Sequence, residues 1–208
     1  MAVILTAPAQ ACYTGLVSIP TAEVVEPGQY GLELQLDGAF AQVNSDPRII
    51  NTELGLSPRF EGGVDSDLSK DTQTRALLNA KYLLLTKDKR HPALALGICS
   101  VGRHVSNTPY LVATQEFGGV RGHLGAARID ERDRWFIGVD HAVNDKLTLM
   151  ADYTSGSDNF ATIGGSYQFT DTFGIMAGAI LPNSPGEDRG FTVHFALNGP
   201  YRHAPKEK

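Results

Sequence analysis

Acidic residues inside apparent strands are the side chains of this sequence whose type and spacing could do chemistry. Asp140 and Asp152 fall on neighbouring segments of alternating hydrophobicity, and two carboxylates that face each other can act as a general acid and a general base. The interpretation that we favour for these two residues is hydrated charges on a lumen wall or surface. The full set of candidate wall residues is Glu33, Glu53, Glu61, Asp65, Lys81, Arg128, Asp140, Asp152 and His194.

Other patterns that could indicate catalysis or metal binding are weak. The six histidines show neither the i, i+4 helical spacing nor the cysteine partners of a zinc site, although His141 and His194 lie on expected strands and could meet across a barrel. Gly-x-Ser-x-Gly does not occur, and Ser-Gly-Ser-Asp at 155–158 has the composition of a turn. We therefore expect no enzyme activity, no metal and no cofactor.

Charge and hydropathy exclude two further classes of protein. The net charge is −5 and no basic stripe appears, which argues against a nucleic-acid partner because phosphate binding needs clustered Lys and Arg. No stretch approaches the roughly 18 to 20 apolar residues of a spanning helix. A membrane barrel is not excluded, since its strands are short and alternate; the aromatic content of 8% is nonetheless low for full aromatic girdles.

An internal repeat is the strongest indication of architecture. Residues His141–Asp152 match Tyr167–Gly178, and a weaker copy occupies 55–65. Each copy is the end of one strand, a polar turn and the start of the next strand. Because a hairpin cannot bury its own faces, repeated hairpins must add side by side into one sheet, and enough of them close into a barrel.

The chain divides into twelve expected strands separated by turn compositions. The segment 76–85 fits a helical face as well as a strand, and its neighbours favour the strand. The pattern predicts an all-β fold, an antiparallel up-and-down barrel of about twelve strands. The expected strands are 30–37, 50–57, 59–65, 76–85, 93–101, 110–117, 122–129, 135–141, 146–154, 160–169, 173–181 and 191–197.

The two faces of these strands differ in polarity. Phe191, Val193, Phe195 and Leu197 alternate with polar or small residues such as His194. The strand interiors are poor in Lys, and most charge lies in turns, whereas the exterior of a soluble barrel is rich in Lys and Glu. We therefore expect the apolar side chains to point outward and the mixed face to line a lumen.

The termini suggest three regions: a lead-in at 1–28, the barrel at 29–198 and a polar tail at 199–208. Ala-Gln-Ala at 9–11 resembles a signal-peptidase site without a basic region before it, so the lead-in is either a remnant of an export signal or an untidy start. The apolar run around Cys99 predicts a buried, unreactive thiol, with a disulfide to Cys12 as the alternative.

The hairpin repeat, the Gly-rich strands and the motif Gly-Leu-Val-Ser-Ile-Pro-Thr-Ala at 15–22 resemble those of bacterial outer-membrane β-barrel proteins, and more narrowly the porin-like barrels associated with exopolysaccharide export. The resemblance implies a location in the outer membrane of the cell envelope and a structural or channel role.

The function that we expect from the sequence is therefore a non-enzymatic outer-membrane barrel, either a narrow channel or a structural envelope protein. Its expected partners are outer-membrane lipid and a small solute. Two alternatives stay open: a soluble or secreted β-barrel with its apolar face inward that binds a small apolar ligand, and a barrel hydrolase that uses inner-wall carboxylates.

Overall fold

The structure, a computed structural model, describes residues 14–41, 48–69, 76–103 and 105–201. The proposed export-signal remnant at 9–11 and Cys12 lie outside these residues. The predicted all-β fold is confirmed, including the strand at 76–85. The strands are β1 (Gln29–Ala39), β2 (Arg48–Ser57), β3 (Phe60–Asp67), β4 (Ala76–Leu85), β5 (Ala93–Val101), β6 (Thr108–Phe117), β7 (Val120–Ile129), β8 (Arg132–Ala142), β9 (Leu147–Thr154), β10 (Phe160–Gln168), β11 (Phe173–Pro182) and β12 (Gly190–Pro200).

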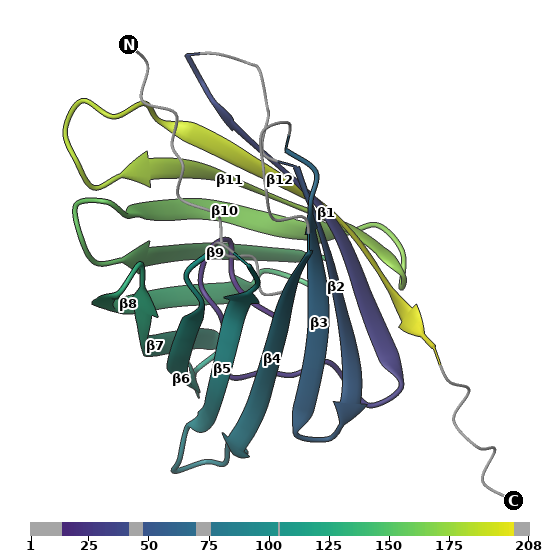
Figure 1. Cartoon of the computed structure of the whole chain (residues 1–208). Helices are drawn as coiled ribbons and strands as arrows, with labels where there is room; N and C mark the ends of the chain where they lie inside the picture. The colour runs from purple at the N-terminus through teal and green to yellow at the C-terminus, as the bar shows by residue number, and fades with distance from the viewer. Residues whose placement is uncertain (1–13, 42–47, 70–75, 104, 202–208) are drawn as a thin grey trace, which may run out of the picture.

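The twelve strands form one closed antiparallel barrel (Figure 1). Each strand pairs with its neighbours in the sequence, and β1 pairs with β12 from Gln29↔Pro200 to Ala39↔Gly190. Closure removes the exposed edges that an open sheet of this length would present. In the described part of the chain we find no helix with the length and hydropathy of a membrane span.

The two rims of the barrel carry connections of different length. The repeat detected in the sequence corresponds to the β8–β9, β10–β11 and β2–β3 hairpins, which lie on one rim because the strands run up and down. β1 begins and β12 ends at this same rim. At the opposite rim the intervals in the sequence are longer, with eight residues between the end of β1 and the start of β2 and eight between β3 and β4.

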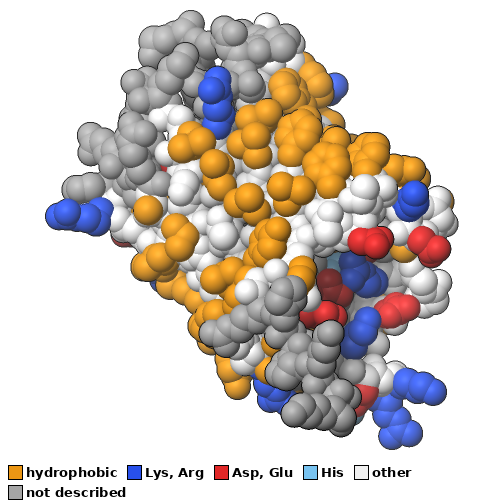
Figure 2. Space-filling model, turned by 90° about the vertical axis from the view of Figure 1, so that its right-hand side faces the viewer, with side chains coloured by type: hydrophobic (Ala, Val, Ile, Leu, Met, Phe, Trp, Pro, Cys, Tyr) orange, Lys and Arg blue, Asp and Glu red, His pale blue; other side chains and the backbone are white. Residues whose placement is uncertain are grey.

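The outer surface of the barrel is apolar. Large side chains at alternating positions are exposed, among them Leu124, Ile137, Val139 and Ile163. Figure 2 shows such side chains gathered in a band, with a hollow beside it in which basic, acidic and histidine side chains gather. The intervening positions point inward, because successive side chains of a strand alternate between faces, and many of them carry polar or charged side chains. The predicted orientation of the faces therefore agrees with the structure.

The bore is not empty, which the sequence analysis did not anticipate. Residues 14–25 lie inside the barrel, and Figure 1 shows this purple segment within the ring of strands. Its apolar side chains pack against the inner face of β4–β9. The inward residues of this apolar half include Leu83, Ala93, Ala95, Cys99, Tyr110, Val112, Ala127, Phe136 and Met150.

Candidate functional site in the barrel bore

Eight of the nine candidate wall residues are buried inside the barrel. They occupy alternate positions on β1–β4, β8, β9 and β12, so the strand pleat directs them all to the inner face. Their exposed fractions are Glu33 4%, Glu53 2%, Glu61 2%, Asp65 7%, Lys81 1%, Asp140 3%, Asp152 4% and His194 0%.

Arg128 differs from the expectation. Its side chain is 59% exposed, and its guanidinium lies 4.0 Å from the carboxylate of Asp133 on the adjoining strand. Inward positions on β7 are His123 and Ala127, and Arg128 falls on the opposite phase of the strand. Arg128 is therefore an outward residue near a rim, and not part of the lumen wall.

One polar cluster joins the two ends of the barrel sheet. Glu33 on β1 accepts a hydrogen bond from Asn51 on β2 at 3.0 Å and lies 2.8 Å from Nδ1 of His194 on β12. The other ring nitrogen of His194 lies 2.7 Å from the Thr192 hydroxyl. The cluster thus ties the β1–β12 seam to β2 from inside.

A second cluster holds the inner segment to β3 and β4. Lys81 lies 2.9 Å from the Glu61 carboxylate, and its ammonium also donates to the carbonyls of Thr14 and Glu23 at 3.1 and 2.9 Å. Glu61 in turn accepts from the backbone N–H of Val25 at 2.7 Å. Both buried charges are therefore satisfied by each other and by the segment inside the bore.

Asp140 and Asp152 do not form an acid–base pair. Asp140 binds the guanidinium of Arg121 and lies 2.7 Å from Nε2 of His123. Asp152 accepts hydrogen bonds from the backbone N–H and the hydroxyl of Ser18. Each carboxylate is occupied by separate partners, so the arrangement proposed for a hydrolase is not present.

Several bore residues were missed by the sequence analysis. Thr114 accepts a hydrogen bond from the backbone N–H of Ala22 at 2.9 Å and lies 2.9 Å from Nδ1 of His123. Arg121 binds Glu23 as well as Asp140. Arg121 and His123 have the i, i+2 spacing of a shared strand face, which was the available signal. Nothing in their local sequence indicates that a distant segment would be their partner.

The inner segment is a compact loop. The N–H of Leu16 donates to the carbonyl of Ile19 at 2.9 Å, and the N–H of Thr21 donates to the carbonyl of Thr14 at 3.2 Å. Gly15 and Pro20 form an isolated antiparallel β-bridge. The loop is connected to the barrel at the rim where β1 begins. There the N–H of Gly28 donates to the carbonyl of Gly55 at 2.9 Å.

Two wall glycines make room for this loop. A Cβ on Gly138 would lie 2.6 Å from both Leu16 and Ile19, and a Cβ on Gly178 would lie 2.9 Å from Val17. These distances are shorter than carbon atoms tolerate. The apolar tip of the loop therefore fits the wall because the wall has no side chains there.

One expectation about a single residue is wrong, and one possibility that the sequence left open is not realised. Cys99 is disulfide-bonded rather than a free thiol; the only other cysteine in the chain is Cys12, outside the described residues. His141 does not meet His194, because its exposed ring lies 3.0 Å from the carbonyl of Gly119 at the rim.

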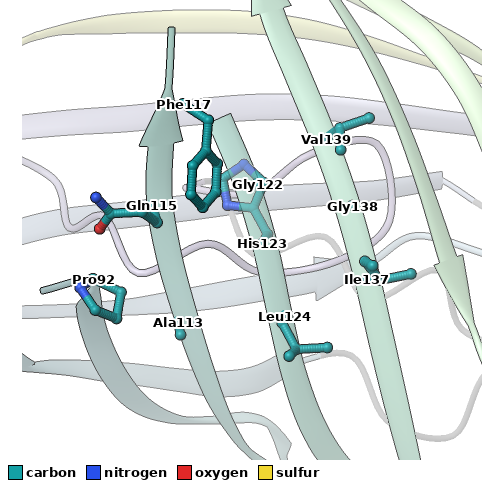
Figure 3. A pocket seen from close by; sticks show the side chains of 10 residues that line it. All are labelled: Pro92, Ala113, Gln115, Phe117, Gly122, His123, Leu124, Ile137, Gly138 and Val139. Atoms are coloured by element: carbon teal, nitrogen blue, oxygen red, sulfur yellow. The ribbon is translucent and has the colours of Figure 1, made fainter. Parts of the chain in front are cut away.

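A shallow hollow of about 330 Å³ lies on the outside of the barrel, across β6, β7 and β8 (Figure 3). Exposed side chains such as Phe117, Leu124 and Ile137 line it. Most of its lining side chains belong to the apolar outer surface, and His123 and Gly138 of the barrel wall contribute to its floor. Among the described residues, no three His, Cys, Asp or Glu side chains are grouped to hold a metal ion.

Comparison with known proteins identifies the fold. No family model and no curated protein matches the sequence. Among solved structures, the KdgM porin matches 80% of this chain and 98% of its own, at 11% identity and a TM-score of 0.58. A complex of that porin with disordered oligogalacturonate gives the same values. The NanC porin matches over 81% and 98% of the two chains, at 8% identity and a TM-score of 0.53.

The chain has the fold of a small porin. The match extends over nearly the whole length of both porins, so it concerns the complete barrel and not a few hairpins. At these identities it establishes the shared architecture, while function has to be argued from the surface and the bore of this chain.

Proposed function

We propose that the chain is a small, non-enzymatic channel of the bacterial outer membrane. The observation that carries this proposal is the inverted polarity of the barrel: Leu, Ile and Val are exposed on the outside, while carboxylates, amides and histidines are buried inside. Such a surface is stable against lipid and unfavourable against water. The alternative of a soluble barrel with its apolar face inward has the opposite orientation.

Aromatic side chains gather at both rims and support insertion into a membrane. Near one rim the rings of Phe40 and Phe191 lie 5.7 Å apart, and those of Trp135 and Tyr153 lie 5.3 Å apart. Near the opposite rim Phe169 packs against Tyr167 at 4.9 Å. Amphipathic rings at two levels are typical of the two interfaces of a bilayer, so the modest aromatic content is placed where a membrane barrel needs it.

The rims also suggest an orientation. Outer-membrane barrels have short periplasmic turns and longer extracellular loops. The rim with the tight β2–β3 and β6–β7 turns also holds the start of β1 and the end of β12. We assign this rim to the periplasm and the opposite rim, at which longer intervals separate β1 from β2 and β3 from β4, to the cell exterior.

The charge of the bore favours cations and neutral hydrophilic solutes. Buried acids outnumber the buried lysine on the described wall, and rings of carboxylates select cations. Within the described residues, polar atoms such as Glu53 Oε2, Gln35 Oε1 and Asp65 Oδ1 have no hydrogen-bond partner, which favours hydrated solutes on this side. An acidic oligosaccharide such as the oligogalacturonate bound by the KdgM porin fits this wall poorly.

The association with exopolysaccharide export is a narrower part of the proposal. It rests on the motif at 15–22, whose resemblance to barrels of that group was noted in the sequence. A neutral glycan is compatible with the excess of acidic side chains on the bore wall, whereas a polyanionic glycan would be repelled by them. Flux of neutral and acidic oligosaccharides of equal length into proteoliposomes tests this point, and faster entry of the acidic one would contradict it.

Membrane insertion is tested by expressing the chain with an export signal and fractionating the cells. We expect the chain in the outer-membrane fraction, solubilised only by detergent, with faster migration on unheated than on heated gels. Recovery of a folded chain in the aqueous fraction would overturn the proposal. Single-channel recordings then test conduction, and a folded, inserted barrel whose bore has been freed of residues 14–25 should pass K⁺ in preference to Cl⁻.

A further inference from the structure

The loop at 14–25 is held by the wall in the way that a binding site holds a peptide. Wall side chains bind its backbone groups: Lys81 donates to the carbonyls of Thr14 and Glu23, and Thr114 accepts from the N–H of Ala22. Contacts of this kind come from β3, β4, β6 and β9. Strands on opposite sides of the bore therefore bind the loop.

The tip of the loop also fits the wall by shape. Val17 and Ile19 are 3% and 2% exposed and lie against Gly178 and Gly138, where any larger side chain would collide with them. Apolar side chains set in a matching wall, with a few placed polar groups around them, are the usual composition of a ligand site.

The barrel does not need the loop for its own hydrogen bonding. All twelve strand pairings close without it, and within the described residues the only β-bridge of the loop joins Gly15 to Pro20 of the loop itself. The disulfide of Cys99, whose only possible partner within the chain is Cys12 just before the loop, holds the loop covalently. Once this bond is reduced, departure of the loop would break side-chain contacts and leave every rung of the barrel ladder intact. The carboxylates that it releases face a polar bore that water can hydrate.

We propose that the bore wall is a peptide-binding site, and that residues 14–25 are its built-in ligand, a plug that keeps the channel closed and becomes removable when the disulfide of Cys99 is reduced. This inference rests on the proposed function, because a plug closes a channel only if the barrel conducts. The ligand class is a short, apolar, turn-forming peptide whose hydroxyl and backbone N–H groups meet wall acids. Because the loop hangs from the rim that we assign to the periplasm, the plug would leave on that side.

The test displaces the plug and leaves the wall unchanged. All recordings are made with dithiothreitol, so that the disulfide of Cys99 does not hold the loop. In the full chain, V17D together with I19D places two charges in the apolar contact at Gly138 and Gly178. We expect this variant to fold, as judged by migration of unheated samples, and to show single-channel conductance well above that of the unaltered chain. A synthetic peptide with the sequence of residues 14–25, added from the periplasmic side, should abolish that gain, and a scrambled peptide should not.

Binding is measured separately from conduction by fluorescence anisotropy of the labelled peptide on the same variant. Adding D152N removes the charge of the group that accepts from Ser18 and replaces one of its two acceptor oxygens by an amide NH₂. It should therefore weaken peptide binding by roughly ten-fold. The matched control is D171N, an exposed aspartate in the β10–β11 turn, which should leave the peptide affinity unchanged.

The outcomes separate the two proposals. Equal conductance of the unaltered chain and the V17D/I19D variant would overturn the plug and leave the channel standing. Saturable binding of the peptide by a folded variant that passes no ions would overturn the channel and keep the peptide site. A folded variant that binds the peptide of residues 14–25 no better than the scrambled peptide would overturn the peptide site.

Discussion

Single residues in the bore owe their state to partners that are distant in the sequence. Lys81 is 1% exposed and is compensated by Glu61, its neighbour on β3, and by two carbonyls of the inner loop. A cation buried to this degree is stable only with such compensation. The ion pair between Lys87 and Glu116 has a similar N–O distance of 3.2 Å but lies at the surface, with the two side chains 48% and 53% exposed.

This contrast gives the first prediction. K81M should lower the free energy of unfolding by about 3–5 kcal/mol, because it leaves the Glu61 carboxylate buried without a cation. K87M, the control, should lower it by less than about 1 kcal/mol, because water screens an exposed pair. Urea unfolding of both variants in detergent micelles or lipid vesicles measures the difference, and equal effects would contradict the buried ion pair.

At the scale of elements, the β4–β5 connection contains a turn held by one carboxylate. The side chain of Asp88 lies within hydrogen-bonding distance of the His91 ring and accepts from the backbone N–H groups of Arg90 and His91. Asp and Asn stabilise turns by this mechanism. The hydrogen bond with the His91 side chain, followed by the two backbone N–H groups, lowers the pKa of Asp88 to about 2.

The second prediction follows from that pKa. A carboxyl whose pKa is lower in the folded than in the unfolded chain stabilises the fold above the unfolded value, and this contribution disappears as the pH falls through about 2. H91A should raise the pKa of Asp88 toward its ordinary value, and R90A should not, because Arg90 contributes its backbone N–H. NMR titration of the Asp88 carboxyl carbon measures both, and an unchanged pKa in H91A would contradict the turn geometry.

The outer face of β10 gives the third prediction. Ile163 is 59% exposed and pairs with Ala179 in the interior of the β10–β11 ladder. In a bilayer I163R should lower stability by about 2–4 kcal/mol, whereas L181R near the strand end should cost about 0–1 kcal/mol, because the cost of a lipid-facing charge depends on depth. Unfolding in phospholipid vesicles measures this gradient. Two small and equal effects would indicate an exterior that faces water.

At the scale of the whole molecule, a disulfide at Cys99 on β5 constrains the chain in addition to barrel closure. Disulfides persist in oxidising compartments, among them the bacterial periplasm and cell surfaces. The disulfide agrees with the proposed location in the cell envelope. The apolar sequence around Cys99 had predicted a free, buried thiol instead.

The fourth prediction concerns this disulfide. C99S should lower the free energy of unfolding by about 2–4 kcal/mol, because an open chain gains conformational entropy when it unfolds. Dithiothreitol should destabilise the unaltered chain by a similar amount and leave C99S unchanged. Denaturant titrations with and without the reductant provide the measurement, and a destabilisation of C99S by dithiothreitol would contradict the assignment.

The sequence by itself determined the architecture and the polarity of the wall. Alternating hydrophobicity and the hairpin repeat are local patterns. Because successive side chains of a strand point to opposite faces, the polarity of each face can be read from every second residue. For this reason Glu33, Asp140 and Asp152 could be assigned to the inner face before any coordinates. Arg128 was misplaced because it stands at a strand end, on the other phase from His123.

Only the tertiary structure decided what the bore contains. From the sequence, the lead-in at 16–27 is expected to be an ordered segment interrupted by Pro and Gly residues. No local pattern connects it with Glu61, Thr114 or Asp152, which it contacts in the structure. Those contacts join residues 36, 92 and 134 positions apart. They form because barrel closure brings several strands around one axis, and a pairing that depends on closure is not encoded in the periodicity of any single segment.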